Sequence, residues 1–183
     1  MLGTKTSELD GNGGILNKMK GIIAVDLFCG AGGLTRGLLD AGIQVVKGFD
    51  INSKFKKTYE ENNPGVSFIS KNVSQLNKQE ILDKIDMKNK YFLLAGCAPC
   101  QPFSTINKQS LREDSRKSLI LEFGRLVEET RPNFIFIENV PGLATGKGKK
   151  IFVEFKKKLD MMNYFYVYQV VDAKTYGVPQ TRK

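Results

Sequence analysis

IIAVDLFCGAGG (residues 22–33) is an apolar run that ends in a turn containing three glycines. The apolar part predicts a buried strand over residues 22–27, and the pattern that follows predicts a helix over about 34–41. The glycines permit a sharp turn with little side-chain bulk. A strand, a glycine turn and a helix N-terminus together form a pocket for a compact ligand at one edge of a sheet.

The alternation of strand and helix patterns continues along the chain. Further strands are expected at residues 45–49, 66–69, 91–95, 134–137 and 164–171, and helices at 53–62 (capped by Ser53), 78–85, 118–130 and 149–161. This alternation predicts an α/β fold with parallel strands and right-handed crossovers. Residues 1–20, rich in Gly, Asn, Ser and Lys, are expected to be a flexible N-terminal extension, and residues 21–183 a single domain.

Composition narrows the class of partner and of chemistry. The 183 residues carry 28 Lys+Arg against 19 Asp+Glu, a net charge of +9, and contain no histidine. The positive charge favours a polyanion such as nucleic acid, although a solvated basic surface is the alternative. No apolar stretch is long enough for a membrane helix, so we expect a cytoplasmic protein with reduced cysteines. Proton transfers must use carboxylates, Lys, Arg, Cys, Tyr or water.

A second stretch, GCAPCQPFS (residues 96–104), holds a cysteine at the end of the strand expected over 91–95. Two prolines stiffen the turn on either side of Cys100, which makes its thiol a candidate nucleophile. Three alternative roles can be considered for these cysteines. Cys97 and Cys100 form a C-x-x-C pattern, which can be a redox pair. A zinc site is disfavoured because the sequence has no histidine, and the role of a buried structural thiol suits Cys29 and Cys97 better than Cys100.

The glycine turn is incomplete as a phosphate-binding motif. The dinucleotide fingerprint needs a third glycine where Thr35 stands, and no Gly-Lys-Ser/Thr follows as in phosphate-loop NTPases. Asp50, at the end of the second expected strand, is placed to accept hydrogen bonds from a ribose diol. These features indicate an adenosine-containing ligand that lacks a diphosphate.

A carboxylate follows the strand expected over 134–137. Glu138 would lie at the same sheet edge as Cys100, where apolar neighbours could raise its pKa so that it donates a proton. A solvated glutamate is the alternative interpretation.

Four ordered blocks, DLFCGAGGL (26–34), PCQ (99–101), ENV (138–140) and QTR (180–182), resemble the catalytic half of the DNA (cytosine-5) methyltransferase family. The resemblance implies a Rossmann-like S-adenosylmethionine-dependent methyltransferase fold with a mostly parallel sheet. It also implies S-adenosylmethionine as methyl donor, double-stranded DNA as substrate and a role in restriction–modification. It implies no metal.

The resemblance also assigns site residues. Cys100 would add to cytosine C6, Glu138 would act at N3, and Arg182 would help to hold the base. Cofactor contacts are implied for Phe28, Gly30, Ala31, Gly32, Gly33, Leu34, Asp50, Ile51, Asn72, Val73, Pro99 and Leu119. Asn72 stands where the family usually has an aspartate that binds the adenine amino group. DNA contacts are implied for Gln101, Ser104, Lys108, Arg112 and Arg116.

The match to the family's sequence pattern is incomplete near the C-terminal end. The family's sheet has the order 3-2-1-4-5-7-6, and the sequence stops before the seventh strand, the second arginine of the QTR block and the target recognition domain. We therefore expect either a second polypeptide that supplies the C-terminal part or a poorly ordered sixth strand. A non-catalytic S-adenosylmethionine-binding subunit and an RNA cytosine-5 methyltransferase remain open alternatives.

Overall fold

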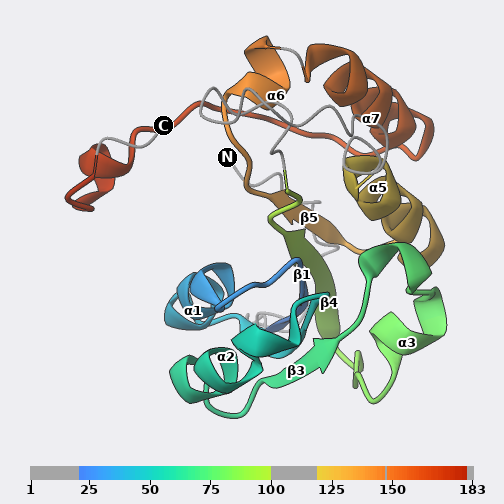
Figure 1. Cartoon of the computed structure of the whole chain (residues 1–183). Helices are drawn as coiled ribbons and strands as arrows, with labels where there is room; N and C mark the ends of the chain where they lie inside the picture. Colours follow the sequence, from blue (N-terminus) through green and yellow to red (C-terminus); the bar gives the residue numbers. More distant parts are fainter. Residues whose placement is uncertain (1–20, 100–118, 147, 181–183) are drawn as a thin grey trace, which may run out of the picture.

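A computed structural model describes residues 21–99, 119–146 and 148–180. Within them, five parallel strands form one sheet of order β3-β2-β1-β4-β5 (Figure 1). The strands are β1 (Gly21–Leu27), β2 (Gln44–Asp50), β3 (Ser67–Ser70), β4 (Lys90–Gly96) and β5 (Phe134–Ile137). The predicted parallel α/β architecture is confirmed, and the observed order agrees with the first five strands implied by the family resemblance.

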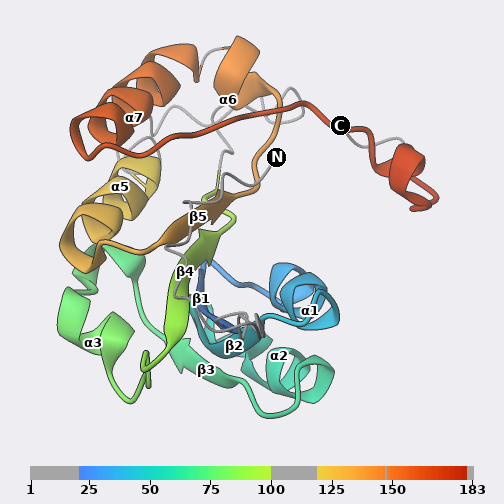
Figure 2. The same ribbon diagram turned by 180° about the vertical axis from the view of Figure 1, so that it is seen from behind.

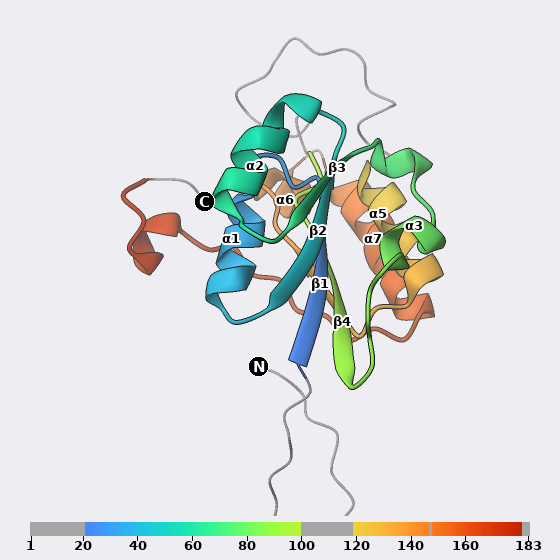
Figure 3. The ribbon, with the colours of Figure 1, turned by 90° about the horizontal axis from the view of Figure 1, so that it is seen from below.

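Helices cover both faces of the sheet. Among the described residues, the α-helices are α1 (Gly33–Asp40), α2 (Lys56–Asn62), α3 (Lys78–Leu82), α5 (Leu119–Thr130), α6 (Gly142–Thr145) and α7 (Lys149–Met161). The single-turn helices are η1 (Ser53–Phe55), η2 (Val73–Gln75) and η4 (Ala173–Tyr176). Figure 3 shows α1 and α2 on one face and α3, α5 and α7 on the other. None of the helices in the described ranges is long and apolar enough to cross a membrane.

The central strand β1 sets the position of the ligand-binding edge. Leu27, its last residue, is in register with Phe49 of β2 and Gly96 of β4. Gly96 permits this close approach, because a Cβ on it would lie 2.8 Å from the Leu27 carbonyl oxygen. The turns that follow β1, β2 and β4 therefore start at the same level of the sheet, at its carboxyl edge.

The prediction of a sixth strand over 164–171 is wrong for the described structure. Strand β5 pairs with β4 on one side, and no described residue pairs with it on the other. The 164–171 segment leads instead from α7 towards η4, which lies away from the sheet (Figures 1 and 2). In the sheet order implied by the family resemblance, a seventh strand lies between β5 and this segment, and no described residue forms that strand.

Two helix boundaries also differ from the predictions. Asn52, not Ser53, caps η1, because its side chain accepts a hydrogen bond from the Lys54 N–H. Helix α3 ends at Leu82 and not near residue 85. Lys84 then adopts a left-handed φ of 56°, which an α-helix cannot continue through.

Candidate active site

Asp50 joins the end of β2 to the glycine turn after β1. Its Oδ2 accepts a hydrogen bond from Gly30 N–H at 3.0 Å, and its Oδ1 accepts one from Asn52 N–H at 2.9 Å. The two backbone donors hold the carboxylate in one orientation. Each oxygen keeps a lone pair for a further donor. The geometry fits the predicted contact with the two hydroxyls of a ribose.

The residues beside Asp50 offer apolar surface. Ile51 is 68% exposed, and Phe28 is half-buried with a left-handed φ of 59°. A bulky residue at positive φ costs about 1–3 kcal/mol, and such strain gathers at ligand sites. Asn72 caps η2 through its Oδ1, and Val73 is buried beside it. Exposed and half-buried apolar side chains next to an oriented carboxylate and an amide oxygen, both hydrogen-bond acceptors, fit the rings and the hydroxyl and amino groups of adenosine.

The glycines of the turn divide into two kinds. A Cβ on Gly30 or Gly33 would meet no atom within 4 Å, so these two line the open side of the turn. Gly32, with φ 92°, instead packs against Tyr59 and Asn63 of the α2 segment. Ala31 is exposed and Leu34 is half-buried. A compact ligand can therefore approach the backbone at Gly30 and Gly33, whereas Gly32 serves the packing beneath.

A buried carboxyl group lies under the turn, and the sequence analysis did not identify it as a separate feature. Asp26 is fully buried; its Oδ2 accepts a hydrogen bond from Thr35 Oγ1 at 2.7 Å, and Thr35 Oγ1 lies 2.9 Å from the Tyr59 hydroxyl. The other oxygen, Oδ1, has no partner. Burial raises the pKa of Asp26 to about 7 and also raises the pKa of the neighbouring Cys29 thiol. Cys29 is thus the buried structural thiol that we expected.

This network predicts a pH-dependent stability. Because the folded-state pKa of Asp26 lies above its unfolded value, the favourable contribution of the protonated form is present below pH 4 and lost as the pH rises through about 7. The loss from this group amounts to on the order of 4 kcal/mol. Urea unfolding of Asp26→Asn between pH 4 and 8 should lack this slope.

Asp40→Asn is the matched control. Asp40 is exposed on α1, and a hydrogen bond from Arg36 lowers the pKa of its carboxyl group. Its replacement should leave the slope in place. An unchanged slope in Asp26→Asn would contradict the assignment of a neutral buried carboxyl group.

The turns after β4 and β5 are tied together. Glu138 N–H donates to Gly96 O at 3.2 Å, and the Asn139 Nδ2 donates to Ala98 O at 3.0 Å. The Asn139 Oδ1 in turn accepts a hydrogen bond from Val140 N–H at 2.8 Å. The Glu138 side chain is exposed, so the surrounding apolar residues of the sequence argument do not bury it. The Asn139 amide thus links the turn after β5, which carries Glu138, to the backbone of Ala98, two residues before Cys100.

We predict that Asn139→Asp lowers the rate of the methyl transfer implied by the family resemblance by about tenfold or more, because misplaced reacting groups lose effective concentration steeply. The variant keeps an oxygen acceptor for Val140 N–H, but it replaces the donor to Ala98 O with a carboxylate oxygen that this carbonyl repels. Asn133→Asp is the control, because the Asn133 Oδ1 accepts from Phe92 N–H at the opposite end of the same strands. Equal rates for the two variants would contradict the prediction.

Several predicted site residues lie outside the described residues, and their placement is not part of the structure. They are Cys100, Gln101, Ser104, Lys108, Arg112, Arg116 and Arg182. The flanking residues are described: Pro99 is exposed after β4, and Leu119 is half-buried at the start of α5.

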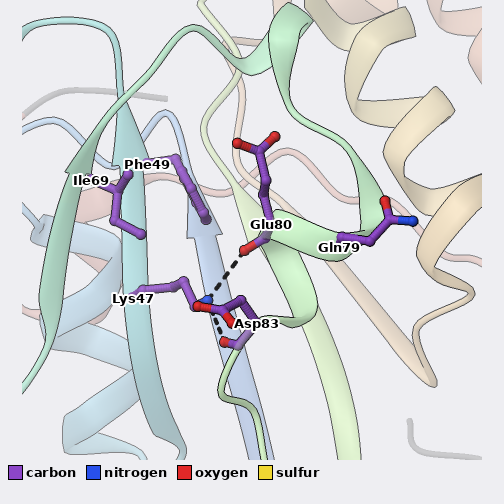
Figure 4. A pocket seen from close by; sticks show the side chains of 6 residues that line it. All are labelled: Lys47, Phe49, Ile69, Gln79, Glu80 and Asp83. Carbon is purple, nitrogen blue, oxygen red and sulfur yellow. Dashed lines mark hydrogen bonds between the residues drawn. The ribbon is translucent and has the colours of Figure 1, made fainter.

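A cavity of about 380 Å³ lies between β2, β3 and α3, lined by Lys47, Phe49, Ile69, Gln79, Glu80 and Asp83 (Figure 4). None of the predicted site residues lines it. The buried Lys47 ammonium donates to Glu80 O at 3.2 Å and Asp83 O at 2.6 Å, and so caps the C-terminus of α3. Its burial lowers the pKa of Lys47. We interpret this cavity as a gap beside a structural cap.

Comparison with known proteins identifies the family to which the chain belongs. The family model for C-5 cytosine-specific DNA methylase matches residues 22–183. Type II methylase M.HgiDII of Herpetosiphon aurantiacus is 40% identical over 158 residues, which are 86% of this chain and 44% of that protein. Type II methyltransferase M.XorII of Xanthomonas oryzae is 35% identical, over 88% of this chain and 38% of that protein. The chain therefore belongs to the C-5 cytosine-specific DNA methylase family.

Solved structures give the same fold. A putative DNA modification methyltransferase encoded within an Escherichia coli prophage superposes with a TM-score of 0.74 at 31% identity, over 88% of this chain and 44% of that one. The S. pombe Dnmt2 methyltransferase superposes with a TM-score of 0.65 at 23% identity, which shows the fold alone. The chain spans less than half the length of each of these proteins.

Proposed function

We propose that the protein transfers a methyl group from S-adenosylmethionine to C5 of cytosine in double-stranded DNA, in the cytoplasm. The observation that supports this most is the carboxyl edge of the sheet. There, Asp50 and the open glycines fit an adenosine-containing donor, and the turns that precede Cys100 and carry Glu138 are joined by Asn139. A methyl donor and a nucleophile at one sheet edge are what this transfer needs.

The chemistry assigned to the chain needs no histidine. The Cys100 thiolate forms a bond to C6 of the flipped-out base, while Glu138 donates a hydrogen bond or proton at N3. The electron pair of the C5–C6 double bond then resides at C5. S-adenosylmethionine would supply an electrophilic methyl group: as C5 forms a bond to the methyl carbon, the sulfonium–methyl bond breaks and S-adenosylhomocysteine leaves. A base removes the C5 proton, the C5–C6 double bond forms again, and the thiolate leaves.

We also propose that a second polypeptide completes the protein. Strand β5 has a free edge among the described residues, and Phe136 on it is 47% exposed. In the 164–171 segment the Tyr164 hydroxyl donates to Pro132 O at 2.6 Å, whereas Phe165 and Val167 are 93% and 77% exposed. Alternating anchored and exposed side chains fit a strand that awaits a neighbour. A polypeptide equivalent to the unmatched part of M.HgiDII would supply that neighbour.

A methyl-transfer assay tests both proposals. The chain is incubated with labelled S-adenosylmethionine and cytosine-containing duplex DNA, with and without the unmatched part of M.HgiDII as a separate polypeptide. We expect 5-methylcytosine in the duplex when both polypeptides are present. Transfer to tRNA in preference to duplex DNA would favour an RNA methyltransferase. Donor binding without transfer in any mixture would favour the non-catalytic subunit.

A further inference from the structure

Arg125 on α5 is held rigidly by its own helix. Its Nε donates to Glu122 at 2.8 Å and its Nη1 donates to Glu129 at 2.6 Å, so carboxylates about one turn away on either side orient the guanidinium plane. The side chain is 31% exposed. A planar guanidinium fixed in this way presents its remaining N–H groups in one direction.

That direction is the η2 turn, on a different part of the chain. Arg125 Nη2 donates to Val73 O at 3.4 Å and to Ser74 O at 3.5 Å. The Val73 carbonyl and the Ser74 N–H belong to the same peptide group, and that N–H donates to Asn72 Oδ1 at 3.0 Å. Hydrogen bonds that share a peptide group polarise one another. One chain of hydrogen bonds therefore runs from α5 through a single peptide group to the Asn72 amide.

This series of hydrogen bonds fixes the orientation of the Asn72 amide. One lone pair of Oδ1 is taken by Ser74, and the second remains as an acceptor. The apolar contacts beneath the turn support the same placement, because Val73 and Leu76 belong to the same core cluster as Phe123 and Leu126 of α5. The Arg125 hydrogen bonds reach the peptide group whose N–H donates to the Asn72 side chain.

We propose that Arg125 is a positioning residue for adenine recognition: through the Val73–Ser74 peptide group it holds Asn72 as an acceptor for the adenine amino group. The inference rests on the proposed use of S-adenosylmethionine. It makes Arg125 a determinant of how well the site distinguishes adenine from a purine without that amino group. An ordinary ion pair within one helix would have no such selectivity.

The test compares Arg125→Gln with Arg36→Gln. Both variants remove a guanidinium paired with a carboxylate on its own helix, but the Arg36 contacts stay within α1. Calorimetry measures the binding of S-adenosylhomocysteine and of S-inosylhomocysteine, in which oxygen replaces the adenine amino group. The chain is mixed with the unmatched part of M.HgiDII, the complementing polypeptide. Arg125→Gln should weaken S-adenosylhomocysteine binding by about tenfold and S-inosylhomocysteine binding by less than about twofold. Arg36→Gln should change neither.

Equal losses for both ligands, or none, would overturn the inference. A second measurement needs no ligand: hydrogen exchange at the Ser74 amide should become faster in Arg125→Gln and stay unchanged in Arg36→Gln. Unchanged exchange at Ser74 in Arg125→Gln would overturn the inference and leave the proposed function intact. A wild-type protein that binds neither ligand would overturn the proposed function, and the role of Arg125 with it.

Discussion

Cys100→Ser should abolish methyl transfer, with a loss of at least about 1,000-fold, and should leave donor binding within about twofold of wild type. A serine hydroxyl has a much higher pKa than a thiol and is not ionised near neutral pH, so it cannot add to C6. The proposed donor site consists of the glycine turn and Asp50, which the substitution does not alter. Labelled-methyl transfer and calorimetry on the same preparation separate the two effects.

Cys97→Ser provides the control for this prediction. Cys97 precedes Cys100 by three residues, and its backbone N–H donates to Leu27 O at 3.2 Å, a bond that the substitution retains. We expect this variant to keep most of its activity. Loss of activity in Cys97→Ser with retention in Cys100→Ser would show that Cys97, and not Cys100, is the nucleophile. Equal loss in both variants would favour the C-x-x-C redox interpretation.

Gly32→Ala should destabilise the fold by about 3 kcal/mol or more. The new methyl group would overlap Asn63 Nδ2 and lie 2.9 Å from Tyr59 Cδ2, at a φ of 92° that L-residues avoid. Neither neighbour can move easily, since both are buried and Asn63 Nδ2 donates to Tyr59 O at 2.9 Å. Overpacking costs about 1–3 kcal/mol, and the left-handed conformation adds about 1–2 kcal/mol. Urea unfolding measures the sum.

Gly37→Ala is the matched substitution, within helix α1, which Gly32 precedes as its N-cap. A Cβ at Gly37 meets no atom within 4 Å, so this change should stabilise α1 by about 0.5–1 kcal/mol. If the two variants unfold at the same urea concentration, then the packing of Gly32 against α2 is not what the structure indicates.

The strand pattern was readable from the sequence because the strands of a parallel sheet are covered on both faces and appear as continuous apolar runs. β1, with five buried residues in succession, is the clearest example. The 164–171 segment has a similar composition, but pairing depends on a neighbour, which composition does not report. The end of α3 was missed for a related reason: Lys47, more than thirty residues earlier, supplies its cap.

In the candidate site, too, local features could be predicted from the sequence, whereas contacts between distant residues could not. Asp50 and the glycines could be predicted as site residues because a turn at a strand end needs particular residue types, and those types are visible in the sequence. The Asp26 network was missed, although a carboxylate inside an apolar strand was a signal that could have identified it. The bond from Asn139 to Ala98 O joins residues 41 apart, and it follows from the register of β4 and β5, which no local pattern encodes.

The most direct test of the account is to trap the covalent intermediate. The chain, with the complementing polypeptide and S-adenosylmethionine, is incubated with duplex DNA in which 5-fluorocytosine replaces the target cytosine. Fluorine at C5 cannot leave as a proton does, so the thioether at C6 persists. Peptide mass spectrometry should then find the methylated nucleotide attached to Cys100. An adduct at Cys97, or a donor-bound protein that forms no adduct, would contradict the assignment of Cys100 as the nucleophile.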